Sequence, residues 1–202
     1  MSYRTYTYDF YNDIVASPHA YVPERSFSGI DIGVGHFDEA IAFSVDDNDN
    51  IYIVDRQNNR IIHIDEEYEL KRIIDEFYHE KNQQTEGFDH PNDISVEPEG
   101  DMYIADSGNN RIIHLNKDGD FVREIVVTGE HDMIDDDYYF SPLKLDVDQS
   151  GRIYVINEGE FEGLLFLQQD AEFAGFIGAP SVDPNPFEYF WQNLIATEEQ
   201  RR

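Results

Sequence analysis

Hydrophobic and polar positions alternate along the middle of the chain in short runs. In Asp93-Ile94-Ser95-Val96 every second residue is apolar, and three further apolar runs follow at residues 102–105, 111–115 and 121–127. The segments between them, residues 97–100, 107–110 and 117–120, contain Gly, Asn, Asp and Pro, which favour tight turns. A period of two with short turns predicts four consecutive antiparallel β-strands.

The same pattern recurs at a constant step. Tyr52, Tyr103 and Tyr154 lie 51 residues apart in similar blocks. The first repeat has strand patterns near residues 41–45, 51–54, 60–64 and 70–74, and the third near 143–147, 153–156, 163–167 and 173–177. A fixed period predicts stacked structural units, and four antiparallel strands per unit are typical of a propeller blade. We predict an all-β fold in which residues 37–178 form three blades, at 37–87, 88–138 and 139–178, and residues 79–88 and 129–140 form acidic connecting loops.

The flanks differ from the repeats. Residues 1–36 predict an N-terminal segment with one lone outer strand at 20–29. Residues 179–202 predict a C-terminal helix, because Phe187, Phe190, Trp191 and Leu194 share one apolar stripe and Pro186 suits a helix start. A stack of three blades leaves an apolar face at each end. We therefore expect both flanks to fold back onto the blades, and the isolated chain either to self-associate, which would complete a propeller, or to be marginally stable.

The charge of the chain narrows its partners. Among 202 residues, 43 are Asp or Glu and 14 are Lys or Arg, a formal net charge of −29. Such a surface repels nucleic-acid phosphates and anionic lipid, and it attracts cations and basic proteins. A high-salt habitat is an alternative explanation, because salt screens self-repulsion.

Cysteine content and hydropathy add little about the compartment. The chain has no cysteine, which excludes disulfides and thiol chemistry. The sequence shows no apolar run long enough to cross a bilayer and no hydrophobic signal segment, so we expect a soluble protein without membrane insertion. The mature part of an exported bacterial protein is an open alternative.

The second repeat carries a family resemblance. Pro91-x-Asp93-Ile94-x-Val96, followed by residues 100–112 (Gly-x-Met-Tyr-Ile-Ala-Asp-Ser-Gly-Asn-Asn-Arg-Ile), resembles the NHL repeat. The first repeat has Ala40 in place of the proline, and the third has Asn157 and Glu162 in place of the aspartate and arginine. The flanks resemble a bacterial NHL-repeat group often labelled gluconolactonase. The resemblance implies a propeller that usually closes with six blades, so this chain is a fragment of a longer propeller, a subunit of an assembled ring, or a short form capped by its flanks.

One set of polar residues recurs with the repeat and predicts structural bonds. Its members are Asp55, Asn59, Arg60, Asp106, Asn110, Arg111 and Asn157. A unique active site does not recur in every blade, so we interpret Asp55 and Asp106 as acceptors for turn amides. We interpret Arg60 and Arg111 as ties between neighbouring strands or blades.

Propeller geometry places ligand-binding candidates where the innermost strands begin. By position these are Asp38, Glu39, Asn92, Asp93 and Lys144, with Tyr138 and Tyr139 as aromatic contact surface beside them. Asp132, Asp135, Asp136 and Asp137 crowd one connector and are candidates for a weak divalent cation site, although a solvated acidic loop is the preferred interpretation. We expect no other cofactor.

The leading functional hypothesis is a non-catalytic binding or scaffold module for a protein, peptide or carbohydrate partner. One alternative is a lactonase-like metal-dependent hydrolase, which needs carboxylates and asparagines from several blades around a divalent metal. Another is a fragment of a longer propeller without independent activity. A metal-dependent thermal shift distinguishes the hydrolase from the binding module.

Overall fold

The computed structural model describes residues 5–17, 25–129, 134, 137–159 and 163–178. The chain divides into two compact units, Met1–Phe37 and Asp38–Arg202. The first unit contains an antiparallel hairpin of β1 (Thr5–Tyr8) and β2 (Ile14–Ser17), with Tyr8 opposite Ile14. The lone strand predicted at 20–29 falls partly outside the described residues, and its described part, residues 25–29, is not a strand.

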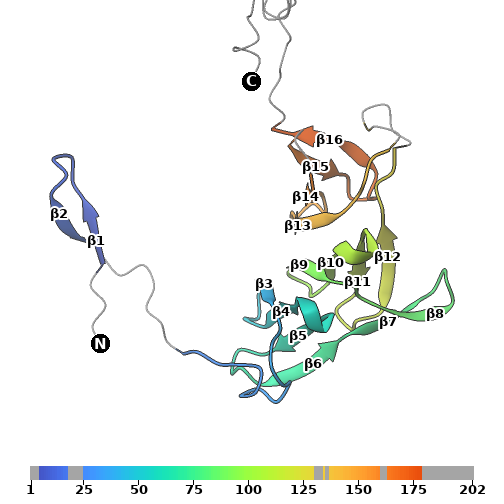
Figure 1. Ribbon diagram of the computed structural model, residues 1–202, viewed down its shortest axis with the longest axis horizontal. Helices are drawn as coiled ribbons and strands as arrows, with labels where there is room; N and C mark the ends of the chain where they lie inside the picture. The colour runs from blue at the N-terminus through green and yellow to red at the C-terminus, as the bar shows by residue number, and fades with distance from the viewer. Residues whose placement is uncertain (1–4, 18–24, 130–133, 135–136, 160–162, 179–202) are drawn as a thin grey trace, which may run out of the picture. The chain divides into compact units, whose positions relative to one another are not determined.

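The second unit contains three four-stranded antiparallel sheets, each with its strands in sequence order (Figure 1). Blade 1 consists of β3 (Ala40–Val45), β4 (Ile51–Asp55), β5 (Arg60–Ile64) and β6 (Leu70–Ile74). Blade 2 consists of β9 (Pro91–Val96), β10 (Met102–Asp106), β11 (Arg111–Leu115) and β12 (Phe121–Ile125). Blade 3 consists of β13 (Pro142–Val147), β14 (Ile153–Asn157), β15 (Leu164–Leu167) and β16 (Phe173–Ile177). The three blades predicted from the repeat are confirmed.

The turn between the second and third strands explains why the Asn-Asn-Arg motif occurs in both of the first two repeats. A 3-10 turn, η1 (Arg56–Asn58) in blade 1 and η2 (Ser107–Asn109) in blade 2, follows the second strand. Each ends at an asparagine in the left-handed region, Asn59 with φ 53° and Asn110 with φ 56°. Asparagine tolerates this conformation better than most residues, so the Asn-Asn-Arg sequence ends the turn and starts the third strand.

The connector between blades 1 and 2 is a hairpin and not the predicted loop. It is formed by β7 (Glu76–His79) and β8 (Gln84–Gly87). Phe77 and His79 are buried, whereas Glu76 and Tyr78 between them are exposed. Phe77 lies parallel to Phe121 with ring centroids 5.8 Å apart. Burial of alternate residues against blade 2 therefore makes a strand of a segment whose polar composition suggested a loop.

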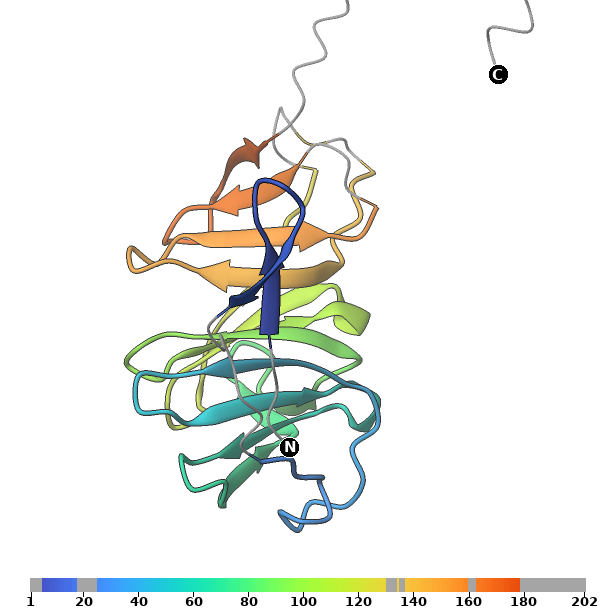
Figure 2. The same ribbon diagram turned by 90° about the vertical axis from the view of Figure 1, so that its left-hand side faces the viewer.

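The hydrophobic core lies between successive blades, which stack one on the next (Figure 2). One cluster joins Tyr52, Val54 and Ile61 of blade 1 to Ile94, Met102 and Ile104 of blade 2, among others. A second joins Tyr103, Ala105 and Ile112 of blade 2 to Leu145, Ile153 and Val155 of blade 3, among others. Each blade thus uses one face for the blade before it and the other for the blade after it.

The predicted C-terminal helix, residues 187–202 with its apolar stripe, lies outside the described residues. Where the structure describes the chain, its helical elements are the two 3-10 turns. None of these described helices has the length and apolar character that a bilayer span requires.

Candidate functional site

A buried polar side chain closes each blade where its second strand ends. Asp55 accepts the backbone N–H of Asp38 at 2.7 Å, and Asp106 accepts that of Asp89 at 2.7 Å. In blade 3 the side chain of Asn157 accepts the N–H of Ser141 at 2.6 Å. These bonds hold the chain that enters each blade against the end of that blade's second strand.

An arginine completes the arrangement in the first two blades. The Nε of Arg60 donates to Asp55 Oδ2 at 2.8 Å, and the Nε of Arg111 donates to Asp106 Oδ2 at the same distance. In blade 3 the equivalent position predicted from the sequence, Glu162, lies outside the described residues. The bonds link the second and third strands at one end of the blade, as expected for charge-assisted pairs with a structural role.

Arg111 has partners that sequence reasoning missed. Its Nη1 donates to Glu86 at 2.6 Å and to Glu124 at 3.0 Å, and its Nη2 donates to the carbonyl of Gly87 at 3.2 Å. Arg111 thereby ties the β7–β8 hairpin to blade 2. The hydrogen bond from Arg111, followed by those from Gln84 and Asn82, lowers the pKa of Glu86 to about 2. The signal for this contact was the alternation of Phe77 and His79 with the polar or exposed Glu76 and Tyr78 in the connector.

Two groups of side chains bring metal-ligating atoms close together. In the first, donor atoms of His79, Glu86 and Glu124 lie within 4.8 Å of one another. The guanidinium of Arg111 already binds both of these carboxylates, which places a positive charge where a cation would bind. This first group is therefore suited to the arginine rather than to a metal.

The second group consists of Glu97, Asp101 and His114. His114 Nε2 lies 3.1 Å from Asp101 Oδ2, and the His114 ring stacks on Tyr103 with centroids 4.1 Å apart. Burial lowers the pKa of His114, whereas burial and the charge of Asp101 raise the pKa of Glu97. His114 has a repeat equivalent in His63, which stacks on Tyr52 at 4.2 Å, so the histidine belongs to the blade packing.

Three of the ligand-binding candidates predicted where the innermost strands begin lie close together. Lys144 Nζ lies 3.4 Å from Asp93 Oδ1 and 3.5 Å from the carbonyl of Asn92. Asp93 also accepts the N–H of Leu145 at 3.0 Å, which joins the inner strands β9 and β13. Asn92 is buried and donates to Ser107 Oγ at 2.7 Å. Asp93 and Lys144 thus face each other across a blade boundary, and the carbonyl of Asn92 lies beside the ammonium group of Lys144.

The remaining candidates lie before the inner strands of blades 1 and 3. Asp38 and Glu39 are exposed, and Glu39 accepts bonds from Arg56 at 2.9 Å and Gln57 at 3.1 Å. The bonds from Gln57 and then Arg56 lower the pKa of Glu39. Tyr139 is 61% exposed. Tyr138 instead packs against the cluster between blades 2 and 3, so the aromatic contact surface predicted for both tyrosines is reduced to Tyr139.

Within the described residues, the acidic connector does not show the cluster of aspartates that was suggested as a cation site. Asp132, Asp135 and Asp136 lie outside the described residues, and Asp137 is exposed. The cation site suggested there stays a prediction.

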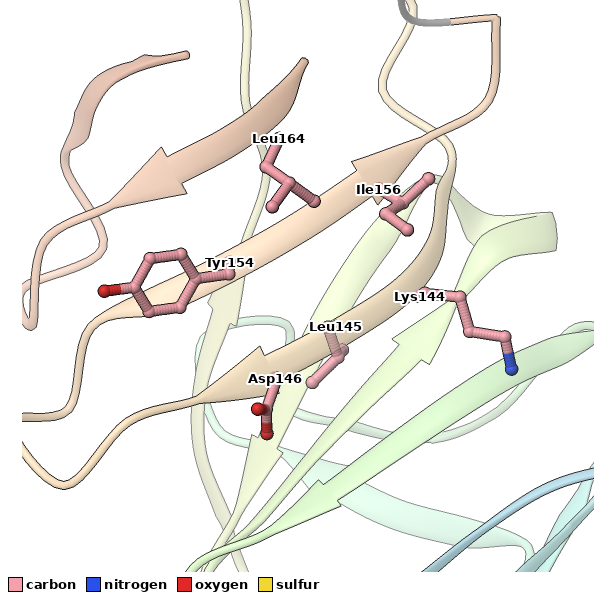
Figure 3. Close-up of a pocket in the computed structure, with 6 residues that line it drawn as sticks. All are labelled: Lys144, Leu145, Asp146, Tyr154, Ile156 and Leu164. Carbon is pink, nitrogen blue, oxygen red and sulfur yellow. The ribbon is translucent and has the colours of Figure 1, made fainter. Parts of the chain in front are cut away.

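The outer face of blade 3 holds a hollow that sequence reasoning missed. Its volume is about 330 Å³, and it is lined by Lys144, Leu145, Asp146, Tyr154, Ile156 and Leu164 from β13, β14 and β15 (Figure 3). The apolar residues Ile156 and Leu164 are exposed by 48% and 37%. The repeat could have indicated this hollow. Ile156 is equivalent to Val54 and Ala105, which are fully buried in their own blades.

Comparison with known proteins supports the fold. Residues 88–115 match the NHL repeat family. The chain resembles the solved structure of hydrazine synthase from Kuenenia stuttgartiensis, with a TM-score of 0.50 and 11% identity over 70% of this chain and 37% of that one. No curated protein matches the chain.

Two further solved structures show weaker similarity. Streptogramin B lyase has a TM-score of 0.47 and 15% identity over 71% of this chain and 42% of its own. A protein of unknown function from Bacteroides caccae has a TM-score of 0.48 and 13% identity over 65% and 46%.

The chain spans less than half the length of each of these three structures. At such identities the likeness concerns the fold alone. The repeat, the strand order and the matched residues agree, and the chain is a β-propeller-type protein with an NHL repeat at residues 88–115.

Proposed function

We propose that this protein is a non-catalytic binding module that holds a basic peptide or protein segment at the end of the blades where the inner strands begin. The observation that carries this proposal is the gathering of carboxylates at that end. Asp38 and Glu39 precede β3, Asp89 precedes β9, and Glu158 follows β14 at the same end of blade 3.

The local charge at this end is negative. Arg56 is paired with Glu39, and Lys144 is paired with Asp93. The carboxylates of Asp38 and Glu158 are exposed, and that of Asp89 is 48% exposed and lies 2.5 Å from His90 Nδ1. With a formal net charge of −29 on the whole chain, this surface favours a cationic partner over a neutral carbohydrate.

Buried side chains hold the backbone that carries this surface. Asp55, Asp106 and Asn157 bind the backbone of the segments that carry the exposed groups, and all three are buried. Anchored backbone reduces the ordering cost of binding. Tyr139, 61% exposed at the entry to blade 3, adds a flat apolar surface for a lysine or arginine side chain.

A fluorescent peptide of alternating Lys and Gly, titrated with the protein and followed by anisotropy at low salt, tests the proposal. The double variant Asp38→Asn, Glu39→Gln should weaken binding by about 3- to 10-fold, because each exposed ion pair contributes about 0.2–1 kcal/mol. The matched control is Glu66→Gln, Glu67→Gln, which removes the same charge from the exposed turn after β5, at the opposite end of blade 1.

Equal weakening in both double variants would show attraction to net charge alone and would contradict the site. Failure of the peptide to bind at low salt would contradict the function. A rise in melting temperature on adding Ca²⁺ or Zn²⁺, with bound metal detected by elemental analysis, would favour the metal-dependent hydrolase instead.

A further inference from the structure

The faces at the two ends of the blade stack are built like the faces that meet inside it. Val54 and Ala105 are fully buried at equivalent positions on blades 1 and 2, but Ile156 of blade 3 is 48% exposed. The third strands show the same contrast. Ile61 pairs with Val54 and Ile112 pairs with Ala105, and both isoleucines are fully buried. Leu164, which precedes the Leu165 that pairs with Val155, is 37% exposed. Blade 3 therefore exposes the face with which blades 1 and 2 each bind the next blade.

Blade 1 exposes the opposite face. Phe43, Ile94 and Leu145 lie 51 residues apart on the three inner strands. Ile94 is 3% exposed and Leu145 is 6% exposed, because each packs against the preceding blade. Phe43 is 70% exposed, with Ile41 and Val45 beside it at 42% and 47%. Blade 1 thus presents a face of the kind that receives a preceding blade.

The inner strands carry a matching polar repeat. Ser44 Oγ accepts the N–H of Val96 at 3.2 Å, and Ser95 Oγ accepts the N–H of Val147 at 3.3 Å. Asp146 takes the equivalent place on blade 3, at the edge of the hollow (Figure 3), where its Oδ1 accepts bonds from Ser95 Oγ at 3.2 Å and from the N–H of Val147 at 3.0 Å. Val45 is the blade 1 equivalent of Val96 and Val147. The other carboxylate oxygen, Asp146 Oδ2, would accept the N–H of a residue placed as Val45 is.

We propose that the open face of blade 3 binds the open face of blade 1 in a second copy of this chain, head to tail. The three described blades carry the two complementary halves of a blade interface on their two end faces, and a second copy offers the matching half of each. The contact buries Ile156, Leu164 and Tyr154 of one copy against Phe43 and its apolar neighbours in the other. Burial of such surface stabilises by roughly 25 cal/mol per Å². Because the two faces differ, the contact is heterologous, and repetition closes a ring or extends a filament.

Sedimentation velocity of the 202-residue protein at 1 to 100 µM tests the proposal. The buffer should contain about 0.5 M NaCl, because copies with a net charge of −29 repel each other at low salt. We expect assemblies larger than the monomer that dissociate on dilution. Phe43→Lys and Ile156→Lys should each shift the protein toward smaller species, and the exposed control Val122→Lys on β12 of blade 2 should not.

Mixing the two variants gives the sharpest result. The Phe43→Lys copy keeps an intact blade 3 face, and the Ile156→Lys copy keeps an intact blade 1 face. If the contact is heterologous, the mixture should form a heterodimer. If it joins identical patches instead, mixing the two variants should not restore assembly. Circular dichroism melts of the separate variants at about 1 µM, where the assembly dissociates, should match the unmodified protein, because both side chains are exposed in the monomer.

A protein that stays monomeric at 100 µM would overturn the proposal and would indicate that another segment covers these faces. An assembly that both variants leave intact would also overturn it. Peptide binding is measured on the Phe43→Lys variant as well, so that loss of assembly and loss of the proposed binding function are separate results.

Discussion

Arg111 and Asp106 form a buried ion pair between β11 and β10, with Arg111 Nε 2.8 Å from Asp106 Oδ2. The Asp106 side chain is fully buried and that of Arg111 is 9% exposed. The same guanidinium binds Glu86 and Glu124, so one residue joins two strands of blade 2 to the hairpin beside it. The pKa of Asp106 is raised by burial, although its hydrogen bonds, including that from Arg111, act in the opposite direction. Burial of the two charges therefore costs free energy, and this cost is offset only while both side chains are present.

Arg111→Ala should reduce the free energy of unfolding by about 1–3 kcal/mol, because a buried acceptor is left without its charge-assisted bond. Urea denaturation followed by circular dichroism measures it. Arg152→Ala is the matched control, since Arg152 pairs with Asp148 on the surface with its side chain 45% exposed. A surface pair contributes about 0–1 kcal/mol. Equal stability of Arg111→Ala and the unmodified protein would show that the pair is kept for binding rather than for the fold.

Glu86→Gln should make the protein less stable at neutral pH and less sensitive to acid. The pKa of Glu86 is lowered from 4.5 to about 2 by the hydrogen bond from Arg111. A carboxylate with a lowered folded-state pKa stabilises fully above its unfolded pKa and loses that contribution as the pH falls toward about 2. The stability difference between Glu86→Gln and the unmodified protein should therefore shrink as the pH falls from about 4.5 to about 2.

Glu76→Gln, on the exposed face of the same hairpin, is the control and should give a small, pH-independent difference. A Glu86→Gln difference that is constant from pH 7 to pH 2 would contradict the assigned pair. Denaturant midpoints at half-unit pH steps provide the measurement.

His63→Phe should relieve part of the loss of stability between pH 7 and pH 5. Burial, and then the charge of Arg72, lower the pKa of His63 to about 4. A base with a lowered folded-state pKa binds protons more readily when unfolded, so stability is full above about pH 6.5 and is lost as the pH falls toward about 4. The effect is on the order of 1 kcal/mol at pH 5.

The chain itself supplies the model for this substitution. Phe166 occupies the place of His63 in blade 3 and stacks on Tyr154 with ring centroids 5.3 Å apart. The free energy of unfolding of both proteins is measured by urea denaturation at pH 7 and pH 5. The loss between the two pH values should be smaller for His63→Phe than for the unmodified protein. The same loss in both proteins would mean that other groups carry the acid sensitivity.

Nucleic acid should not bind. Gel-shift assays with single- and double-stranded DNA and RNA at about 20 mM salt should show no complex, because phosphates and a chain of net charge −29 repel each other most strongly at low salt. A complex that weakens as salt is added would contradict this prediction.

Much of the blade structure followed from the sequence. The step of 51 residues and the alternation within each repeat set the strands because a strand has a period of two, whatever surrounds it. The Asn-Asn turns were equally local, since they depend on the backbone freedom of Asn59 and Asn110. The pairing of Asp55 with Arg60 and of Asp106 with Arg111 required only that the two strands be joined by a short turn.

Contacts between segments far apart in the sequence depended on the tertiary structure. The polar connector becomes the β7–β8 hairpin because Phe77 and His79 find apolar and aromatic partners on blade 2. Glu86 meets Arg111 for the same reason, and Tyr138 is drawn into the core while Tyr139 stays exposed. Whether an apolar residue is core or surface was also not local. Val54 and Ile156 read alike in the repeat, but only Val54 has a following blade in the structure to cover it.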